Sequence, residues 1–189
     1  MKNIFIDTGH SKRFPGASGL RSEVDWVRTI CAALVPLLNK SKWSIQLVPD
    51  AYGSADRTST SNLLYRIAWI NKRAKDGDWL LSIHANGWTN AKANGIETCY
   101  MGGSEYMHKK AIELSTIISK ATGMRLRDDG SYPDNRPTSS GRARIAMVRD
   151  TRPPALLVEC GFVTNPQDMA VKPALIAKSI ADFFNGPGI

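Results

Sequence analysis

Residues 155–158 read Ala-Leu-Leu-Val, and Glu159 follows them directly. An uninterrupted apolar strand of this kind is typical of a sheet that is covered on both faces. Further strands, rich in apolar residues, are predicted at 3–6, 45–48, 79–84, 96–100 and 145–148, and the strand that begins at 155 extends to about 160. The chain is therefore built around several buried strands.

Segments with helical periodicity separate these strands. Ser22 to Asp25 has the pattern of a capping box, and Val27, Cys31, Leu34 and Leu38 then fall on one helical face. Further helices are predicted over about 59–74, 104–122 and 173–184, with Gly123 as a helix C-cap. Alternating strands and helices predict an α/β fold, a single-domain three-layer sandwich over residues 1–189. Its twisted sheet is mostly parallel, with helices on both faces.

Composition limits the classes of protein that fit. The chain has 189 residues, of which 42% are hydrophobic, so it can bury a core and is not a disordered chain. The longest apolar run, residues 31–38, is too short for a membrane span. Three cysteines without a CxxC spacing predict buried reduced thiols.

The net charge of +8 favours anionic partners, among them nucleic acid, membrane headgroups and anionic cell-wall polymers. No block of five like charges is present, which argues against a basic tail that binds nucleic acid. At the N-terminus, three apolar residues meet Asp7 at once, whereas an export signal needs a longer apolar stretch. We therefore expect synthesis in the cytoplasm without a signal peptide.

Two of the three histidines follow buried strands. His10 comes just after the strand at 3–6, and His84 ends the strand at 79–84. In open α/β sheets, ligands bind outside the carboxyl ends of the strands. For either residue alone, a partly buried histidine with satisfied hydrogen bonds is the simpler explanation. Two such residues at one edge of a sheet favour a shared site.

Two carboxylates strengthen this interpretation. Glu159 follows four apolar strand residues, where a charge is costly unless it is paired or bound to a metal. Glu23 opens the first helix, a position that the helix dipole alone would favour. An ion pair of Glu159 with Arg149 or Arg152 is the structural alternative. His10, Glu23 and His84 together form the ligand set of a catalytic zinc site, which leaves Glu159 as a spare carboxylate able to take a proton from water.

Four blocks of sequence resemble a known family. They are 4–10 (IFIDTGH), 19–23 (GLRSE), 81–86 (LSIHAN) and 154–165 (PALLVECGFVTN), and the segment 94–97 (NGIE) is a weaker match. In this combination and order they resemble the catalytic domain of the zinc-dependent N-acetylmuramoyl-L-alanine amidases, which bacterial autolysins and phage endolysins share. The resemblance implies that His10, Glu23 and His84 bind one zinc ion per chain and that Glu159 is the catalytic carboxylate.

The resemblance also implies the reaction, which is hydrolysis of the amide between the lactyl group of N-acetylmuramic acid and L-alanine in peptidoglycan. Asn86 and Arg149 are candidates for substrate binding. A zinc peptidase or carboxypeptidase acting on the stem peptide is the alternative enzyme. A basic binding module for wall polymer or nucleic acid is the alternative outside enzymes. We expect peptidoglycan as partner, with no nucleic acid, a monomeric chain, and action on the wall after release by lysis of the host or the producing cell.

The stretch 125–144 is predicted to be a long irregular loop. Six arginines and three aspartates lie between positions 125 and 149. Such a loop either contacts stem-peptide carboxylates and wall polymers or is simply solvated. The family sometimes has a regulatory helix in this region, but Gly130, Pro133 and Pro137 argue against a long helix here, so we expect an open cleft.

Overall fold

The computed structural model describes residues 1–138, 141–142 and 144–189. Its main feature is a six-stranded sheet with the order β2-β1-β3-β8-β4-β5. Strands β1, β2, β3 and β8 run parallel, and β4 is antiparallel to β8 and parallel to β5. The strands are β1 (Lys2–Asp7), β2 (Trp43–Leu47), β3 (Trp79–Asn86), β4 (Ile96–Tyr100), β5 (Leu126–Pro133) and β8 (Ala155–Phe162).

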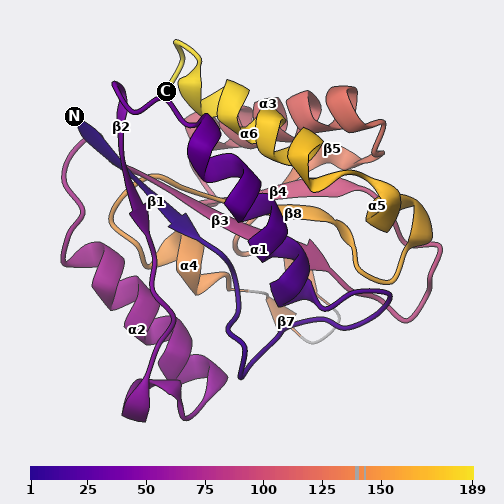
Figure 1. The fold of residues 1–189 in the computed structure, drawn as a ribbon, viewed down its shortest axis with the longest axis horizontal. Coiled ribbons are helices and arrows are strands. Elements are labelled where there is room, and N and C mark those ends of the chain that lie inside the picture. Colours follow the sequence, from indigo (N-terminus) through magenta and orange to yellow (C-terminus); the bar gives the residue numbers. More distant parts are fainter. Residues whose placement is uncertain (139–140, 143) are drawn as a thin grey trace.

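Helices cover both faces of this sheet (Figure 1). The α-helices are α1 (Glu23–Leu34), α2 (Ser59–Asn71), α3 (Glu105–Thr122), α4 (Ala146–Arg149), α5 (Pro166–Ala170) and α6 (Pro173–Asn185). Two short 3-10 helices are η1 (Val35–Leu37) and η2 (Gly53–Asp56). The larger core cluster joins the sheet to α1, α3 and α6, and the smaller one joins the opposite face to α2 and α4. The predicted three-layer α/β sandwich is confirmed.

Alternation along the strands decides which residues face which layer. On β8, Leu156 and Val158 belong to the larger cluster, whereas Ala155 and Leu157 belong to the smaller one. Successive strand side chains point to opposite faces, so Glu159 lies on the face of α2 and α4.

Most predicted elements are present with small shifts of their ends. Gly123 ends α3 in the left-handed conformation (φ 75°), and its N–H donates to Ser119 at 2.8 Å. The three cysteines are buried and free, as predicted. The prediction of a capping box at the start of α1 was wrong, because the Ser22 side chain makes no cap hydrogen bond.

The predicted strand at 145–148 was also wrong, because residues 146–148 belong to the short helix α4 and Ile145 directly precedes it. Its end is fixed by the N–H of Asp150, which donates to the carbonyl of Ala146 at 2.8 Å. Met147 and Val148 are buried in the smaller core cluster. A short apolar run fits either a strand or one helical turn, so periodicity could not decide between them.

The stretch 125–144 is more regular than predicted. Residues 126–133 form β5 at one edge of the sheet, and β6 (Pro137–Thr138) pairs antiparallel with β7 (Gly141–Arg142). No long helix occurs in the described part of this stretch, as expected. Positions 139–140 and 143 lie outside the described residues. Among the helices that the structure describes, none has the length and apolar character needed to cross a membrane.

Candidate active site

His10 reaches the site through a tight turn after β1. Gly9 has φ 54° and His10 has φ 34°, both in the left-handed region. A Cβ on Gly9 would lie 2.7 Å from the carbonyl oxygen of Ile83 and 2.9 Å from Nε2 of His84. The turn therefore passes so close to β3 that only glycine fits, and this contact brings His10 beside His84.

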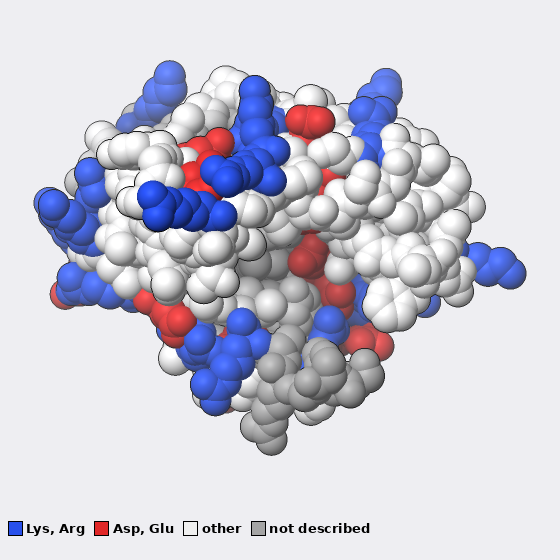
Figure 2. All heavy atoms as spheres, turned by 90° about the horizontal axis from the view of Figure 1, so that it is seen from below, with Lys and Arg blue, Asp and Glu red and all other residues white. Residues whose placement is uncertain are grey.

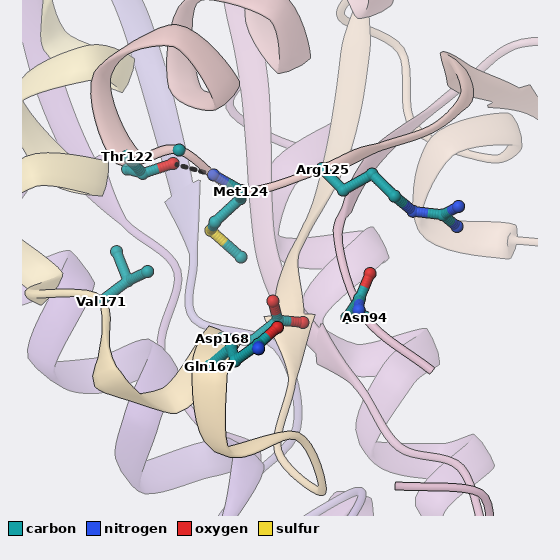
Figure 3. Close-up of a pocket in the computed structure, with 8 residues that line it drawn as sticks. Asn94, Thr122, Met124, Arg125, Gln167, Asp168 and Val171 are labelled. Atoms are coloured by element: carbon teal, nitrogen blue, oxygen red, sulfur yellow. Dashed lines mark hydrogen bonds between the residues drawn. The ribbon is translucent and has the colours of Figure 1, made fainter. Parts of the chain in front are cut away.

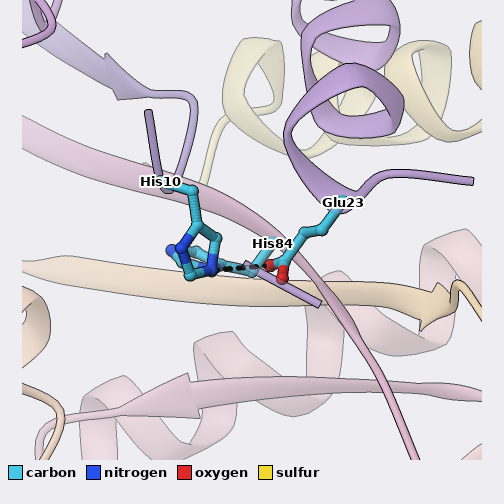
Figure 4. A group of neighbouring side chains, drawn as sticks. All are labelled: His10, Glu23 and His84. Carbon is cyan, nitrogen blue, oxygen red and sulfur yellow. Dashed lines mark hydrogen bonds and ion pairs between the residues drawn. The ribbon is translucent and has the colours of Figure 1, made fainter. Parts of the chain in front are cut away.

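Glu23 joins the two histidines. Its Oε1 lies 3.1 Å from Nε2 of His10 and 3.0 Å from Nδ1 of His84 (Figure 4). Backbone N–H groups hold the carboxylate in place, with Ala17 donating to Oε2 at 2.7 Å and Ala85 donating to Oε1 at 3.0 Å. Burial raises the pKa of Glu23, but the hydrogen bonds and charges of the two histidines outweigh it and hold this pKa well below its usual range.

These three residues fit a metal ion. Their ligand atoms, two imidazole nitrogens and one carboxylate oxygen, all lie within 4.8 Å of one another. Two histidines and a glutamate are the protein ligands of one common type of catalytic zinc site. Gly16 borders the group, and a Cβ there would lie 2.6 Å from Nε2 of His10. The sequence prediction that His10, Glu23 and His84 converge agrees with this geometry.

Glu159 lies beside the ligand group on the next strand. It is the direct neighbour of His84 in the β3–β8 register, and both residues line a pocket of about 220 Å³ with His10. Its Oε2 is buried and has no hydrogen-bond partner among the described residues. Burial first, and then the charges of Glu23 and Glu97, raise the pKa of Glu159 well above its usual value. The carboxylate is thus free to interact with a ligand in the pocket.

A buried ion pair supports this edge of the sheet. Asp7, at the end of β1, accepts from Nη1 of Arg66 at 2.6 Å and from the hydroxyl of Ser82 at 2.6 Å. Burial raises the pKa of Asp7, but the Arg66 guanidinium and the Ser82 hydroxyl lower it below the usual value. Since Arg66 belongs to α2 and lines the pocket, the pair joins β1, β3 and α2 around the site.

The other two predicted site residues are not brought to the ligand group. The Asn86 side chain turns to Glu97 and donates to its Oε1 at 3.1 Å. The Arg149 guanidinium is paired with neighbouring Asp150 at 2.7 Å and lines a different pocket, beside Met101 and Asp134. The pocket at Glu159 is lined instead by Arg144 and Arg66.

Sequence reasoning gave Glu97 no role, although it is a buried neighbour of the site. Glu97 pairs with Glu159 in the β4–β8 register and is only 2% exposed. Because β4 runs antiparallel to β8, the start of β4 lies beside the end of β8. The signal in the sequence was a charged residue within the predicted strand at 96–100, although it is weaker than for Glu159, which follows four apolar residues.

A separate pocket of about 190 Å³ lies between the ends of α3 and α5 (Figure 3). None of the predicted site residues lines it. Its acidic residue, Asp168, uses Oδ2 to accept from the N–H groups of Gly95 and Phe162, both at 2.9 Å. Asp168 therefore has a structural role in joining α5 to the sheet.

The face of the molecule seen from below Figure 1 is hollowed near its middle (Figure 2). Acidic side chains lie within the recess, whereas lysines and arginines project around its edge.

The fold and the site together define an α/β domain with a candidate metal centre at the carboxyl ends of its parallel strands. Residues 4–181 match the N-acetylmuramoyl-L-alanine amidase family Amidase_3, and the chain belongs to this family. The match covers all four ligand and carboxylate positions described above. The family resemblance seen in the sequence is therefore confirmed.

Individual proteins agree with this assignment. An uncharacterised cell wall amidase of Bacillus anthracis is 29% identical over 175 residues, which cover 88% of this chain and 31% of that protein. The N-acetylmuramoyl-L-alanine amidase LytC of Bacillus subtilis is 26% identical over 178 residues, which cover 88% of this chain and 30% of LytC. The chain thus spans about a third of the length of these curated relatives.

Among solved structures, an N-acetylmuramoyl-L-alanine amidase from Clostridium difficile 630 superposes with a TM-score of 0.76. The two chains are 26% identical, and the match covers 96% of this chain and 94% of the other. The similarity extends over nearly the whole domain, so the sheet and both helical layers are shared.

Proposed function

We propose that this chain hydrolyses the amide bond between the lactyl group of N-acetylmuramic acid and the L-alanine of the peptidoglycan stem peptide. Membership of the amidase family supports the choice of bond. The observation that carries the proposal is the convergence of His10, Glu23 and His84 beside the unpartnered carboxylate of Glu159. This arrangement supplies three metal ligands and a separate proton acceptor in one pocket.

The three ligands fit one zinc ion, which would be held by Nε2 of His10, Nδ1 of His84 and the Glu23 carboxylate. A zinc ion at this position would make water more acidic and polarise the scissile carbonyl. The buried hydrogen bonds from Ala17 and Ala85 fix the Glu23 carboxylate, so the ligands are organised before any ion binds.

Glu159 performs the proton transfers in this proposal. Its carboxylate accepts a proton as the water oxygen bonds to the lactyl carbonyl carbon, and it then gives that proton to the alanine nitrogen as the carbon–nitrogen bond breaks. The products are a free lactyl carboxylate on the glycan and a stem peptide with a free amino terminus. The lack of a competing hydrogen-bond partner at Oε2 supports this role.

The same proposal places the chain on the cell wall, where it degrades peptidoglycan in host-cell lysis or autolysis. The net charge of +8 supports retention by anionic wall polymers.

Mass spectrometry of purified walls digested by the protein, with and without chelator, tests this function. We expect stem peptides that begin with free L-alanine beside intact glycan, and no such products after chelation. Cleavage within the stem peptide would identify a zinc peptidase instead. Products that persist unchanged after complete removal of metal would overturn the metal-dependent mechanism.

A further inference from the structure

A second polar cluster extends the site across the sheet. Its centre is Glu97, whose Oε1 lies 3.0 Å from Nε of Arg127 and whose Oε2 lies 2.9 Å from Nη1 of Arg136. Asn86 adds a hydrogen bond to Oε1 at 3.1 Å. One buried carboxylate is therefore shared by two guanidinium groups, and the cluster carries a net positive charge.

Both arginines retain hydrogen-bonding capacity. Arg127 and Arg136 have side chains that are 29% and 38% exposed, and both line a pocket of about 270 Å³. Nη1 of Arg136 donates a hydrogen bond to Glu97, whereas Nε of Arg127 lies within ion-pair distance of Glu97 but has no hydrogen-bond partner among the described residues. The remaining guanidinium nitrogens are donors that suit an anionic ligand.

Aromatic rings hold the two guanidinium groups in place. Arg127 lies over Phe162, with 4.9 Å from its guanidinium carbon to the ring centroid. Arg136 lies over Tyr132 at 4.1 Å. Stacking of this kind fixes the plane of a guanidinium and lowers the entropy lost when it binds a carboxylate. The pocket is thus a preorganised anion site.

The sheet order places this pocket at a definite distance from the ligand group. His84, Glu159 and Glu97 are register neighbours on β3, β8 and β4, and Arg127 lies on β5 beyond them. Adjacent strands are about 4.8 Å apart, and β4 lies two strands from β3. Glu97 on β4 is therefore roughly 10 Å from His84 on β3, measured across the sheet. An extended peptide covers this distance in about three residues.

We propose that Arg127 and Arg136 bind a free carboxylate of the stem peptide, one to three residues beyond the scissile amide. This inference rests on the proposed amidase function and assigns the substrate's peptide side to this pocket. The unmodified sugars of the glycan are neutral, so the peptide supplies the anion that two guanidinium groups select. Glu97 is a positioning residue, because it holds both arginines and leaves their outer nitrogens free. The pocket therefore discriminates a carboxylate from the corresponding carboxamide.

Two synthetic muramoyl tripeptides test this proposal. They differ only in whether the carboxyl groups beyond L-alanine, the C-terminal one included, are all free carboxylates or all carboxamides. We expect kcat/KM to be at least tenfold higher for the carboxylate form, with most of the difference in KM. Arg127→Gln leaves Arg136 and Asn86 on Glu97, and it should reduce this preference to less than threefold.

Arg152→Gln is the matched control, because it removes the same charge next to the amino end of β8, away from the pocket. It should retain the full preference. Equal cleavage of both substrates by the unmodified protein, or an equal loss of preference in both variants, would overturn the proposal.

Calorimetric titration with the two corresponding free stem tripeptides separates this proposal from the amidase function. If neither substrate is cleaved but the carboxylate peptide still binds at least tenfold more tightly, the anion pocket stands and the proposed function fails. If both substrates are cleaved equally and both peptides bind equally, the function stands and the anion pocket is wrong.

Discussion

Gly16 keeps the space beside the ligand group open. It has φ 76°, and a Cβ there would lie 2.5 Å from Cδ2 of His10. Gly16→Ala should therefore weaken zinc binding at least tenfold by displacing His10 and Glu23. Gly53 has φ 60° with no atom within 4 Å of a Cβ, so Gly53→Ala carries the same backbone cost of about 1–2 kcal/mol without the collision.

Competition titration with a zinc chelator measures this difference in the two variants. Zinc affinity equal to that of the unmodified protein in Gly16→Ala would show that the ligand group does not need this close packing.

At the scale of residues, the predicted convergence agrees with the structure where a chemical group followed a buried strand, whereas the roles assigned to these residues stay predictions. The sequence placed His10, His84 and Glu159 at or just after the end of such a strand, and the structure brings all three to one pocket, although β3 and β8 continue beyond His84 and Glu159. Asn86 was proposed as a loop donor, but it is the last residue of β3 and its side chain donates to Glu97 instead. Glu97 was missed because its position depends on β4 running antiparallel, and no local pattern specifies strand direction.

At the scale of elements, the Asp7–Arg66 pair joins β1 to α2. Arg66 is 6% exposed, so Asp7→Asn leaves a buried guanidinium without its counter-charge. The expected loss of unfolding free energy at pH 7 is about 3–5 kcal/mol. Arg28 and Asp50 form an exposed pair, so Asp50→Asn is the control and should cost less than about 1 kcal/mol.

This pair also predicts a pH dependence. The folded-state pKa of Asp7 is lowered below its usual value of 3.8. The stability that the ionised Asp7 carboxylate contributes is therefore fully present above pH 3.8. The contribution is lost as the pH falls through the lower folded-state pKa. In urea unfolding, the difference in unfolding free energy between the unmodified protein and Asp7→Asn should be constant from pH 7 to 5. It should become smaller below pH 3.8. A difference that increases on acidification would contradict this role.

The strands with strong apolar runs and the longer helices were predictable because their patterns extend over several turns or a full buried strand. The segment at 145–148 was misassigned because four apolar residues suit both a strand and one helical turn. Strand β5 was missed because glycine and charged residues interrupt its sequence, and its pairing with β4 at the sheet edge holds it in place.

For the whole molecule, the net charge of +8 predicts that salt weakens retention on anionic walls. Raising the salt concentration from 50 to 500 mM should reduce the fraction of protein bound to purified walls severalfold. Cleavage of a short soluble muramoyl peptide should change less, because it presents few charges. An equal effect of salt on both substrates would assign the dependence to the catalytic pocket and not to the charged surface.

The separation of metal binding from proton transfer is the central claim, and Glu159→Gln tests it most directly. We predict that this variant retains one zinc ion per chain, because His10, Glu23 and His84 are intact, and that its turnover falls by about 10²–10⁴-fold. Glu113→Gln, at an exposed carboxylate paired with Lys110, is the control and should keep normal turnover. Zinc content and amide cleavage measured on the same samples decide the question. Near-normal turnover of Glu159→Gln would contradict the account.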